Sequence, residues 1–406
     1  DYPVEDLREG FKDNGYRADD SVTIVGWMKD MPAEAWEKGR SVEILRNNIF
    51  MDKQESFVAA MDSTGRFSVR VPLVNTSEIY IDIGRKGINT VVEPGETYFL
   101  LHDFSTGHVL FMGEDVRLQN ELQTHPPLYV DGYLRKGQGT VDEFRIQMEE
   151  KYRHAVEELS RRVEEHPNLS RRYRYYMESF VLTGLGCSMM QVRFAVPGWQ
   201  LPEDYVDFVR TKVWQRPPKP YTLCQTFSTL MRDYIDHSSE AKDKVRGDVT
   251  FNAFESLQQR GEISMTEEEV NAVEAYQLVV RELQEKLNAE PSDSLRQRMV
   301  VEFGKSDLGQ RFISLFKRFE DVLNEEVLAD NIDFWKENAE SVGCDSILCQ
   351  IHLARNLYRQ IDNIRKPLPD RMMTKAEREI RLEGGWDIVS REQEKYVAIQ
   401  NRDLSG

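Results

Sequence analysis

The sequence predicts an α+β protein in which an antiparallel β-sandwich is followed by a large all-α region. Between residues 21 and 115, apolar residues alternate with polar ones in short runs, and turn-forming residues separate these runs at roughly 8–12-residue spacing. After residue 115 the apolar spacing becomes that of helices. We therefore expect a flexible leader over residues 1–20, the sandwich over 21–115, a helical domain over 116–365, and a charged tail or linker over 366–406.

About eight short strands are expected in the sandwich. Residues 57–61 run into the turn sequence of residues 62–65, after which Phe67, Val69 and Val71 alternate with polar neighbours. This pattern predicts a hairpin with one solvent-facing side. The other alternating or apolar runs are residues 22–28, 79–83, 91–92 (before the turn of residues 93–96), 98–101 and 109–112.

Helical stripes of apolar residues run through the second region. Thr266 and Glu269 form a capping box ahead of the stripe that contains Val273 and Tyr276. The proline-rich loop over residues 216–220 divides the region. Other stripes begin at Phe144, Tyr173, Leu308 and Ile347. From residue 370 onward the chain is charged and offers little to bury, so we expect a loose end or linker there.

Charge and hydropathy limit the classes of partner. The chain carries 53 Lys and Arg against 70 Asp and Glu, a net charge of −17. So acidic a protein is a poor binder of nucleic acid and of anionic lipid. Arginines and tyrosines mix over residues 171–176, but Tyr173 and Tyr176 fall on an apolar stripe. We therefore expect no nucleic-acid partner. The sequence contains no apolar run of about 18 residues, so no membrane-spanning helix is expected.

The four cysteines are Cys187, Cys224, Cys344 and Cys349, and they form no C-x-x-C motif. A zinc ribbon and a thioredoxin-type redox site are therefore not expected. Cys344 and Cys349 cannot bridge if both are helical, because five residues separate them by about 7.5 Å along the axis and turn them to different faces. Cys187 is expected to be a buried small apolar group, and whether it meets Cys224 is open.

No catalytic, cofactor-binding or metal-binding residue can be assigned from the sequence, and no cofactor is expected. His102, Asp103 and His108 lie on neighbouring expected strands, and Asp115 and His125 follow. They could converge on a metal ion, but no tight ligand spacing supports this, so we expect solvent-facing strand and turn residues.

Tryptophans are the other candidate contact residues. Trp27, Trp36, Trp199 and Trp214 could anchor a ligand, although aromatic residues more often fill interfaces. The pair Gly184 and Gly186 lacks the third glycine of a dinucleotide fingerprint, which favours close helix packing instead. A hydrolase is disfavoured because no set of nucleophile, base and orienting residue is evident.

Four segments carry a family resemblance. They are VTIVGWM at 22–28, FVAAMDSTGRFSVRVPL at 57–73, VVEPGETYFLL at 91–101 and LFMGEDVRLQNEL at 110–122, in this order. Together they resemble the N-terminal region of the TlpA-like thioredoxin-family disulfide reductases of Bacteroidetes bacteria. The segments span about a quarter of the chain. In that family a helical stretch follows the β domain and precedes a thioredoxin domain.

The resemblance implies an exported protein of the periplasm or cell envelope, whose membrane contact would come only from an N-terminal lipid anchor outside this chain. The family's W-C-x-x-C motif is absent here, so no redox residue carries over. The implied role is a non-catalytic accessory or interaction region of a thiol:disulfide reductase. It would position the covalently linked thioredoxin domain or bind a protein client. The alternative is a standalone periplasmic or cell-surface binding or scaffold protein of unknown ligand.

Overall fold

The computed structural model describes residues 8–83, 87–196, 201–246, 249–290 and 292–403. The chain divides into two compact units, each described by itself. Unit 1 consists of Asp1–Ser238, Ala339–Pro367 and Glu379–Gly406, and unit 2 of Ser239–Asn338 and Leu368–Arg378. The division differs from the expected boundary near residue 115, because the sandwich shares unit 1 with the helices that follow it.

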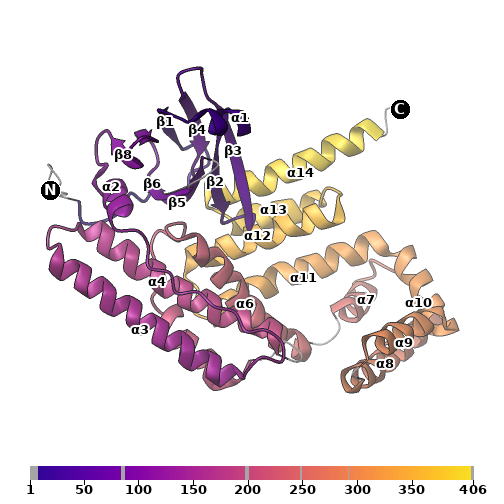
Figure 1. Cartoon of the computed structure of the whole chain (residues 1–406). Helices are drawn as coiled ribbons and strands as arrows, with labels where there is room; N and C mark the ends of the chain where they lie inside the picture. Colours follow the sequence, from indigo (N-terminus) through magenta and orange to yellow (C-terminus); the bar gives the residue numbers. More distant parts are fainter. Residues whose placement is uncertain (1–7, 84–86, 197–200, 247–248, 291, 404–406) are drawn as a thin grey trace. The chain divides into compact units, whose positions relative to one another are not determined.

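Eight strands in unit 1 form two four-stranded sheets, as the sequence predicts (Figure 1). One sheet has the order β4-β1-β7-β8 and the other the order β3-β2-β5-β6. The strands are β1 (Ser21–Lys29), β2 (Ser41–Asn48), β3 (Lys53–Ala60), β4 (Arg66–Pro72), β5 (Ser77–Asp82), β6 (Gly87–Val92), β7 (Thr97–Asp103) and β8 (His108–Met112), and the short helix α1 (Ala33–Lys38) lies between β1 and β2.

The sandwich core comes from the alternation of side chains along each strand. Residues of β1 alternate between half-buried and buried, and those of β2 do nearly the same. Ile24, Ile44 and Ile81 are each no more than 1% exposed and belong to one apolar cluster. Most ladders are antiparallel, as expected, but β1 and β7 pair in parallel, with Ile24 opposite Tyr98.

The predicted hairpin over residues 57–71 is wrong. Both strands form, and Gly65 takes a positive φ of 79° in the turn between them. However, β3 pairs with β2 in one sheet and β4 pairs with β1 in the other. The turn is a corner between the two sheets. Alternation identifies a strand with one buried face, and both sheets of a sandwich supply that face.

The remaining regular elements of the described chain are helices. In unit 1 they are α2 (Arg117–Thr124), α3 (Val141–Glu165), α4 (Arg171–Gln191), a 3₁₀ turn (Val192–Ala195), α5 (Glu203–Val209), a π-helical turn (Arg210–Trp214), most of α6 (Gln225–Arg246), α12 (Ser346–Ile364) and α14 (Glu383–Asp403). In unit 2 they are α7 (Val249–Gln259), α8 (Glu267–Ala289), α9 (Asp293–Lys305), α10 (Asp307–Arg318), most of α11 (Glu320–Ser341) and most of α13 (Asp370–Glu379).

Two sequence features of the helices are confirmed. Thr266 and Glu269 form the expected capping box at the start of α8. The glycines of α4 allow close packing. A Cβ on Gly184 would lie 2.8 Å from the Val130 carbonyl oxygen, and one on Gly186 would lie 2.7 Å from a Val213 methyl group. Within the described residues, no helix is both long enough and apolar enough to cross a bilayer.

The described parts of the two terminal regions differ from what was expected, whereas residues 1–7 and 404–406 lie outside the described residues. Tyr16, in the region expected to be a loose leader, is only 1% exposed, and its carbonyl oxygen accepts a 2.7 Å hydrogen bond from the Gly384 amide. The region expected to be a charged tail forms α13 and α14 and buries Met372 and Val389. A few apolar residues at helical spacing are enough to fix these helices, although the segment is charged overall.

Candidate functional site

A cleft of about 710 Å³ lies in unit 1 between α3 and the segment formed by α5 and the π-helical turn. Its walls combine acidic, basic and apolar side chains. The lining residues are Ile146, Glu149, Glu150, Tyr152, Arg153, Leu185, Phe208, Thr211, Lys212 and Arg216. This volume falls within the range of about 300–1,000 Å³ that is usual for ligand pockets.

The α3 wall follows from helical spacing. Ile146, Glu149, Glu150 and Arg153 are spaced so that they share one face of the helix. A capping box, in which Thr140 and Glu143 exchange hydrogen bonds, fixes the start of α3. The wall is therefore a straight row of exposed side chains on a well-anchored helix.

The opposite wall contains the π-helical turn. The Gln215 amide donates to the Arg210 carbonyl oxygen at 3.1 Å, a bond that spans five residues instead of four. The wider turn carries Thr211 and Lys212 on the cleft side, while Val213 and Trp214 are buried. Single π turns inside helices often occur at functional sites.

Unpaired positive charge distinguishes the cleft. Arg153 forms ion pairs with Glu150 and Glu157, which lie on the same helix. Within the part of the chain that the structure describes, Lys212 and Arg216 are exposed and make no ion pair. Burial raises the pKa of Tyr152, and the positive charge of Arg216 partly offsets this rise. Glu149 and Glu150 line the α3 side of the cleft, so a negatively charged group with an apolar portion fits the side formed by Lys212 and Arg216.

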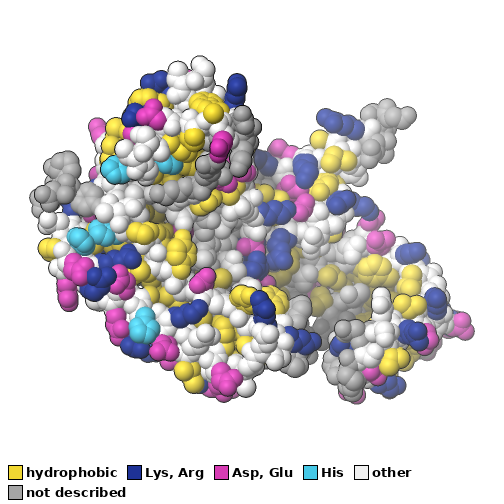
Figure 2. Space-filling view, viewed as in Figure 1, with side chains coloured by type: hydrophobic (Ala, Val, Ile, Leu, Met, Phe, Trp, Pro, Cys, Tyr) yellow, Lys and Arg dark blue, Asp and Glu magenta, His cyan; other side chains and the backbone are white. Residues whose placement is uncertain are grey.

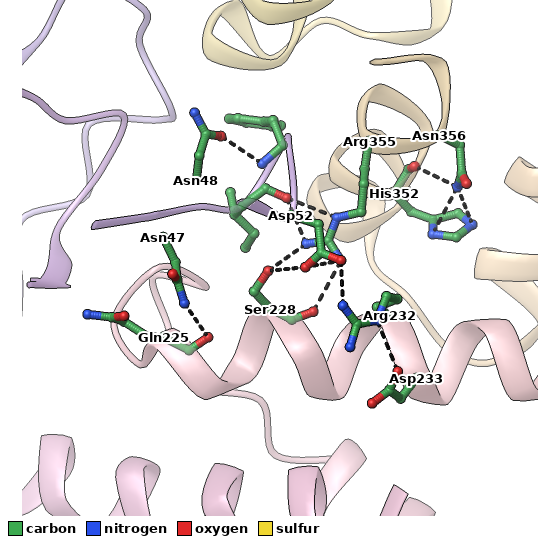
Figure 3. Close-up of polar contacts among 12 residues, drawn as sticks. Asn47, Asn48, Asp52, Gln225, Ser228, Arg232, Asp233, His352, Arg355 and Asn356 are labelled. Atoms are coloured by element: carbon green, nitrogen blue, oxygen red, sulfur yellow. Dashed lines mark hydrogen bonds and ion pairs between the residues drawn. The ribbon is translucent and has the colours of Figure 1, made fainter. Parts of the chain in front are cut away.

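A second cluster of polar groups is buried where the turn between β2 and β3 meets α6 and α12 (Figure 3). Asp52, which adopts a φ of 54°, accepts hydrogen bonds from Ser228 Oγ at 3.1 Å and Arg232 Nη1 at 2.7 Å. Arg355 is 1% exposed and donates to the Ile49 carbonyl oxygen at 3.0 and 2.7 Å. It also donates to the carbonyl and hydroxyl oxygens of Ser228, at 3.1 and 2.9 Å.

This cluster contains serine, histidine and aspartate, but not in a catalytic arrangement. The Ser228 hydroxyl donates a hydrogen bond to Asp52 and accepts one from Arg355, and Ser228 as a whole is only 6% exposed. His352 lies beside Asn356 on the same helix and makes no hydrogen bond to Ser228 in Figure 3. A nucleophile needs a hydrogen-bonded base and access to substrate. The cluster is therefore a structural clamp.

Burial within this clamp shifts two pKa values. Burial lowers the pKa of Arg355 to about 10, and Asp52 opposes that change. Burial, together with the nearby positive charges of Arg355 and Arg359, lowers the pKa of His352 to about 3. His352 is therefore neutral in the folded protein throughout the physiological pH range.

The His352 shift predicts acid sensitivity. The unfolded chain has a histidine pKa near 6.5, so it binds this proton as the pH falls while the folded chain does not. At pH 5 this linkage lowers the free energy of unfolding by about 2 kcal/mol relative to pH 8. In urea unfolding at both pH values, His352→Gln is expected to lack this contribution, whereas His108→Gln, at an exposed position, retains it. Equal pH dependence in both variants would contradict the prediction.

A third cluster joins the sandwich to the helices and contains residues of the motifs described above. Glu93 is fully buried, and its carboxylate accepts hydrogen bonds from Arg8 at 2.6 and 2.8 Å, the Lys12 amide at 2.8 Å and Arg172 at 3.3 Å. Asn120 bonds both the amide and the carbonyl of Phe111, at 2.8 and 2.9 Å.

Glu121 completes the third cluster. Its buried carboxylate accepts from the Ser170 amide at 2.8 Å and from Arg117 Nε at 3.0 Å, and it also bonds the Ser170 hydroxyl. Arg172 and the apolar-stripe residues Tyr173 and Tyr176 are likewise buried. Positions 172, 173 and 176 of the arginine–tyrosine segment therefore lie in the protein interior. On the face drawn in Figure 2, positive and negative side chains intermingle.

The histidines and aspartates considered as metal ligands are not brought together. His102 is buried and stacks on Phe104, with ring centroids 4.3 Å apart, and Asp103 pairs with Lys29 at 2.7 Å. His125 packs against His166 at 4.5 Å. Among the described residues, no group of three or more His, Cys, Asp or Glu side chains is placed to hold a metal ion.

The tryptophans have different surroundings. Trp27 is half-buried beneath Arg66, and its Nε1 donates to the Thr64 carbonyl oxygen at 3.0 Å. Trp214 is 6% exposed and stacks on Tyr234, with centroids 4.5 Å apart. Trp36 is half-buried, and Trp199 lies outside the described residues. None of the three described tryptophans lines the cleft.

All four cysteines are free thiols. Cys187 was expected to be buried but is half-buried, and partial burial raises the pKa of its thiol to about 12, which makes the thiol unreactive. Cys224 is 1% exposed, and burial raises its thiol pKa as well. Cys187 and Cys224 are not joined by a disulfide.

The cleft residues were not predicted from the sequence. Those on α3 resemble an ordinary solvated helix face, and Lys212 and Arg216 are separated from them by more than 50 residues. Comparison with known proteins finds no matching family model, no matching curated protein and no matching solved structure. The relationship to TlpA-like reductases therefore stays a prediction from the sequence motifs.

Proposed function

We propose that this chain is the non-catalytic accessory and interaction region of an exported, TlpA-like thiol:disulfide reductase. The observation that carries the proposal is the third cluster. Its residues Glu93, Asn120 and Glu121 belong to the segments that carry the resemblance, and each makes several hydrogen bonds at the junction of sandwich and helices. The ordered motifs thus have a common physical reason, which is to hold a β domain firmly on a helical platform.

The cleft between α3 and α5 is the proposed contact point for the protein that this region serves, either a client or the covalently linked thioredoxin domain. Lys212 and Arg216 would attract acidic side chains, and Ile146, which is 63% exposed, would contact apolar ones. An extended acidic and apolar segment of a partner matches these groups. From the resemblance, the protein would reside in the periplasm or cell envelope, with any lipid anchor outside this chain.

A standalone periplasmic or cell-surface binding protein is the second candidate. The volume of the cleft favours it, since about 710 Å³ also suits a small organic anion. The two candidates differ in what fills the same cleft. Binding of a small dicarboxylate, with no affinity for unfolded proteins or thioredoxin domains, would favour this second candidate.

Charge reversal of the cleft tests the proposed contact. We expect the purified chain to bind a TlpA-type thioredoxin domain or a reduced, alkylated unfolded protein. Lys212→Glu combined with Arg216→Glu is expected to weaken this binding about tenfold, equivalent to about 1.4 kcal/mol. The matched control is Arg40→Glu with Lys136→Glu, which reverses two exposed cations outside the cleft. Isothermal titration calorimetry gives the dissociation constants.

If the cleft and control variants weaken partner binding equally, the effect comes from the overall charge of the chain, and the cleft assignment is contradicted. Family membership is tested separately by the intact mass and C-terminal peptides of the protein from its source cells. A mass well above 47.4 kDa, with a W-C-x-x-C peptide beyond Gly406, supports the accessory role. A mass near 47.4 kDa with no such peptide argues against it.

A further inference from the structure

Cys344 and Cys349 meet at the start of α12. The side chain of Asp345 caps this helix by accepting a 3.0 Å hydrogen bond from the Leu348 amide. Cys344 therefore lies just before the cap and Cys349 is the fourth residue of the helix. These are the two positions whose side chains pack together when a hydrophobic staple closes a helix start. Cys349 Sγ lies 3.6 Å from the Cys344 carbonyl oxygen.

This geometry corrects the argument against a bridge between the two cysteines. That argument requires both residues to be helical, and Cys344 is not, because α11 ends at Ser341 and α12 begins at Ser346. Gly343 takes a φ of 83° and reverses the chain between the two helices. The reversal turns Cys344 back over the first turn of α12.

The surroundings of Cys344 disfavour the thiolate form of its side chain. Both cysteines are half-buried. The neighbouring Cys349 thiol, burial and the Asp345 carboxylate all raise the pKa of the Cys344 thiol. Because the thiolate is the reactive form, a protonated, half-buried thiol reacts slowly with small oxidants. Reaction is favoured once one sulfur has been activated, since its partner is already in place.

We propose that Cys344 and Cys349 form a reversible intramolecular disulfide, which makes them a redox site within this chain. The co-reactant is a disulfide, either of a thioredoxin-like protein or of a small thiol. One cysteine thiolate attacks a sulfur of that disulfide and releases the first thiol. The second cysteine then attacks the mixed disulfide and releases the second thiol. The two cysteines lose two electrons and two protons, and the co-reactant is reduced to two thiols.

A buried tryptophan reports on this site. Trp214 Nε1 donates to the Val342 carbonyl oxygen at 2.8 Å, two residues before Cys344. Tyr221 and Tyr234 are also close, since the Tyr221 hydroxyl donates to the carboxylate of Asp345, next to Cys344, and Tyr234 stacks on Trp214. Trp214 ends the π-helical turn, which lines the cleft. Oxidation of the pair is therefore expected to change Trp214 emission. This inference does not depend on the proposed function.

Thiol counting tests the proposal on the full chain. The protein is equilibrated in oxidised and reduced glutathione at several ratios, quenched in acid, unfolded and alkylated. We expect the alkylated thiols to fall from four to two as the mixture becomes oxidising. A single tryptic peptide, residues 337–355, contains both cysteines and is expected to become lighter by two hydrogen atoms relative to its unalkylated reduced form.

Variants assign the change to this pair. Cys187→Ser is expected to lose two thiols on oxidation, as the wild type does, whereas Cys344→Ser and Cys349→Ser form no internal bridge and lose the redox response of Trp214 emission. Far-ultraviolet circular dichroism checks that each variant is folded. The proposal is overturned if the peptide keeps two alkylated cysteines at every ratio. It is equally overturned if the stable product carries glutathione on one cysteine or links two chains.

Discussion

Arg355→Met is expected to lower the free energy of unfolding of unit 1 by about 3–5 kcal/mol. The substitution removes the donors that satisfy the carbonyl oxygens of Ile49 and Ser228, and it takes a positive charge from beside Asp52. Buried acceptors that lose their donors retain the full penalty of having left water. Methionine fills much of the volume but replaces none of these hydrogen bonds.

The control for Arg355→Met is Arg359→Met, one helical turn further along α12. Arg359 is exposed, and surface substitutions usually change stability by no more than about 0.5 kcal/mol. Urea unfolding monitored by the amide hydrogen exchange of β2 and α12 isolates unit 1 from unit 2. Similar losses of unfolding free energy in the two variants would mean that removing any arginine charge from α12 has this effect, and that the hydrogen bonds of the clamp do not account for it.

The fold class follows from side-chain periodicity, which is a local property. Alternation in β1 and helical spacing in α4 are each set by which face is buried, so eight strands and the helices after them could be predicted. Pairing between strands is not local. The run from β3 to β4 looks like a hairpin, yet each strand bonds a different neighbour because the turn crosses from one sheet to the other.

The buried clamp was harder to predict because it depends on distant segments. Asp52, Ser228 and Arg355 lie more than 100 residues apart and give no shared sequence signal. The cysteine pair was detectable in principle, because Asp345 before an apolar helix is a recognisable cap. Recognising that cap places Cys344 outside the helix and brings the two thiols together.

Buried charge at the junction of sandwich and helices is a consistent feature of unit 1. Glu93, Arg172 and Arg355 are each no more than 1% exposed, and each is matched by groups from other segments. Such matched groups add little net stability compared with apolar packing, but they penalise any other alignment of the same surfaces. The arrangement favours a junction that is fixed in position.

Glu78 is the exception among these buried charges and predicts a marked pH dependence. Its carboxylate accepts a 2.9 Å hydrogen bond from the Gln225 amide, and among the described residues no ion pair reaches it. Burial raises the pKa of Glu78 from 4.5 to about 7. The folded chain therefore holds this proton more tightly than the unfolded chain. Stability is greatest below about pH 4.5 for this group and falls as the pH rises to about 7.

Between these pH values, the Glu78 contribution to the free energy of unfolding is expected to decrease by about 3 kcal/mol. Glu78→Gln keeps an oxygen acceptor for the Gln225 amide and cannot ionise. This variant is expected to be more stable than the wild type by up to that amount at pH 8, with the difference nearly gone at pH 4.5. Urea unfolding at both pH values measures the change.

Glu114→Gln is the control, because it removes an exposed carboxylate of the same unit. His352 acts in the opposite direction, since its contribution is lost as the pH falls, so differences between variants are more informative than the wild-type curve alone. A stability difference between Glu78→Gln and the wild type that is the same at both pH values would mean that Glu78 does not take up a proton in the folded state. The Glu78 carboxylate would then be charged inside the junction and stabilised there by the hydrogen bond from the Gln225 amide.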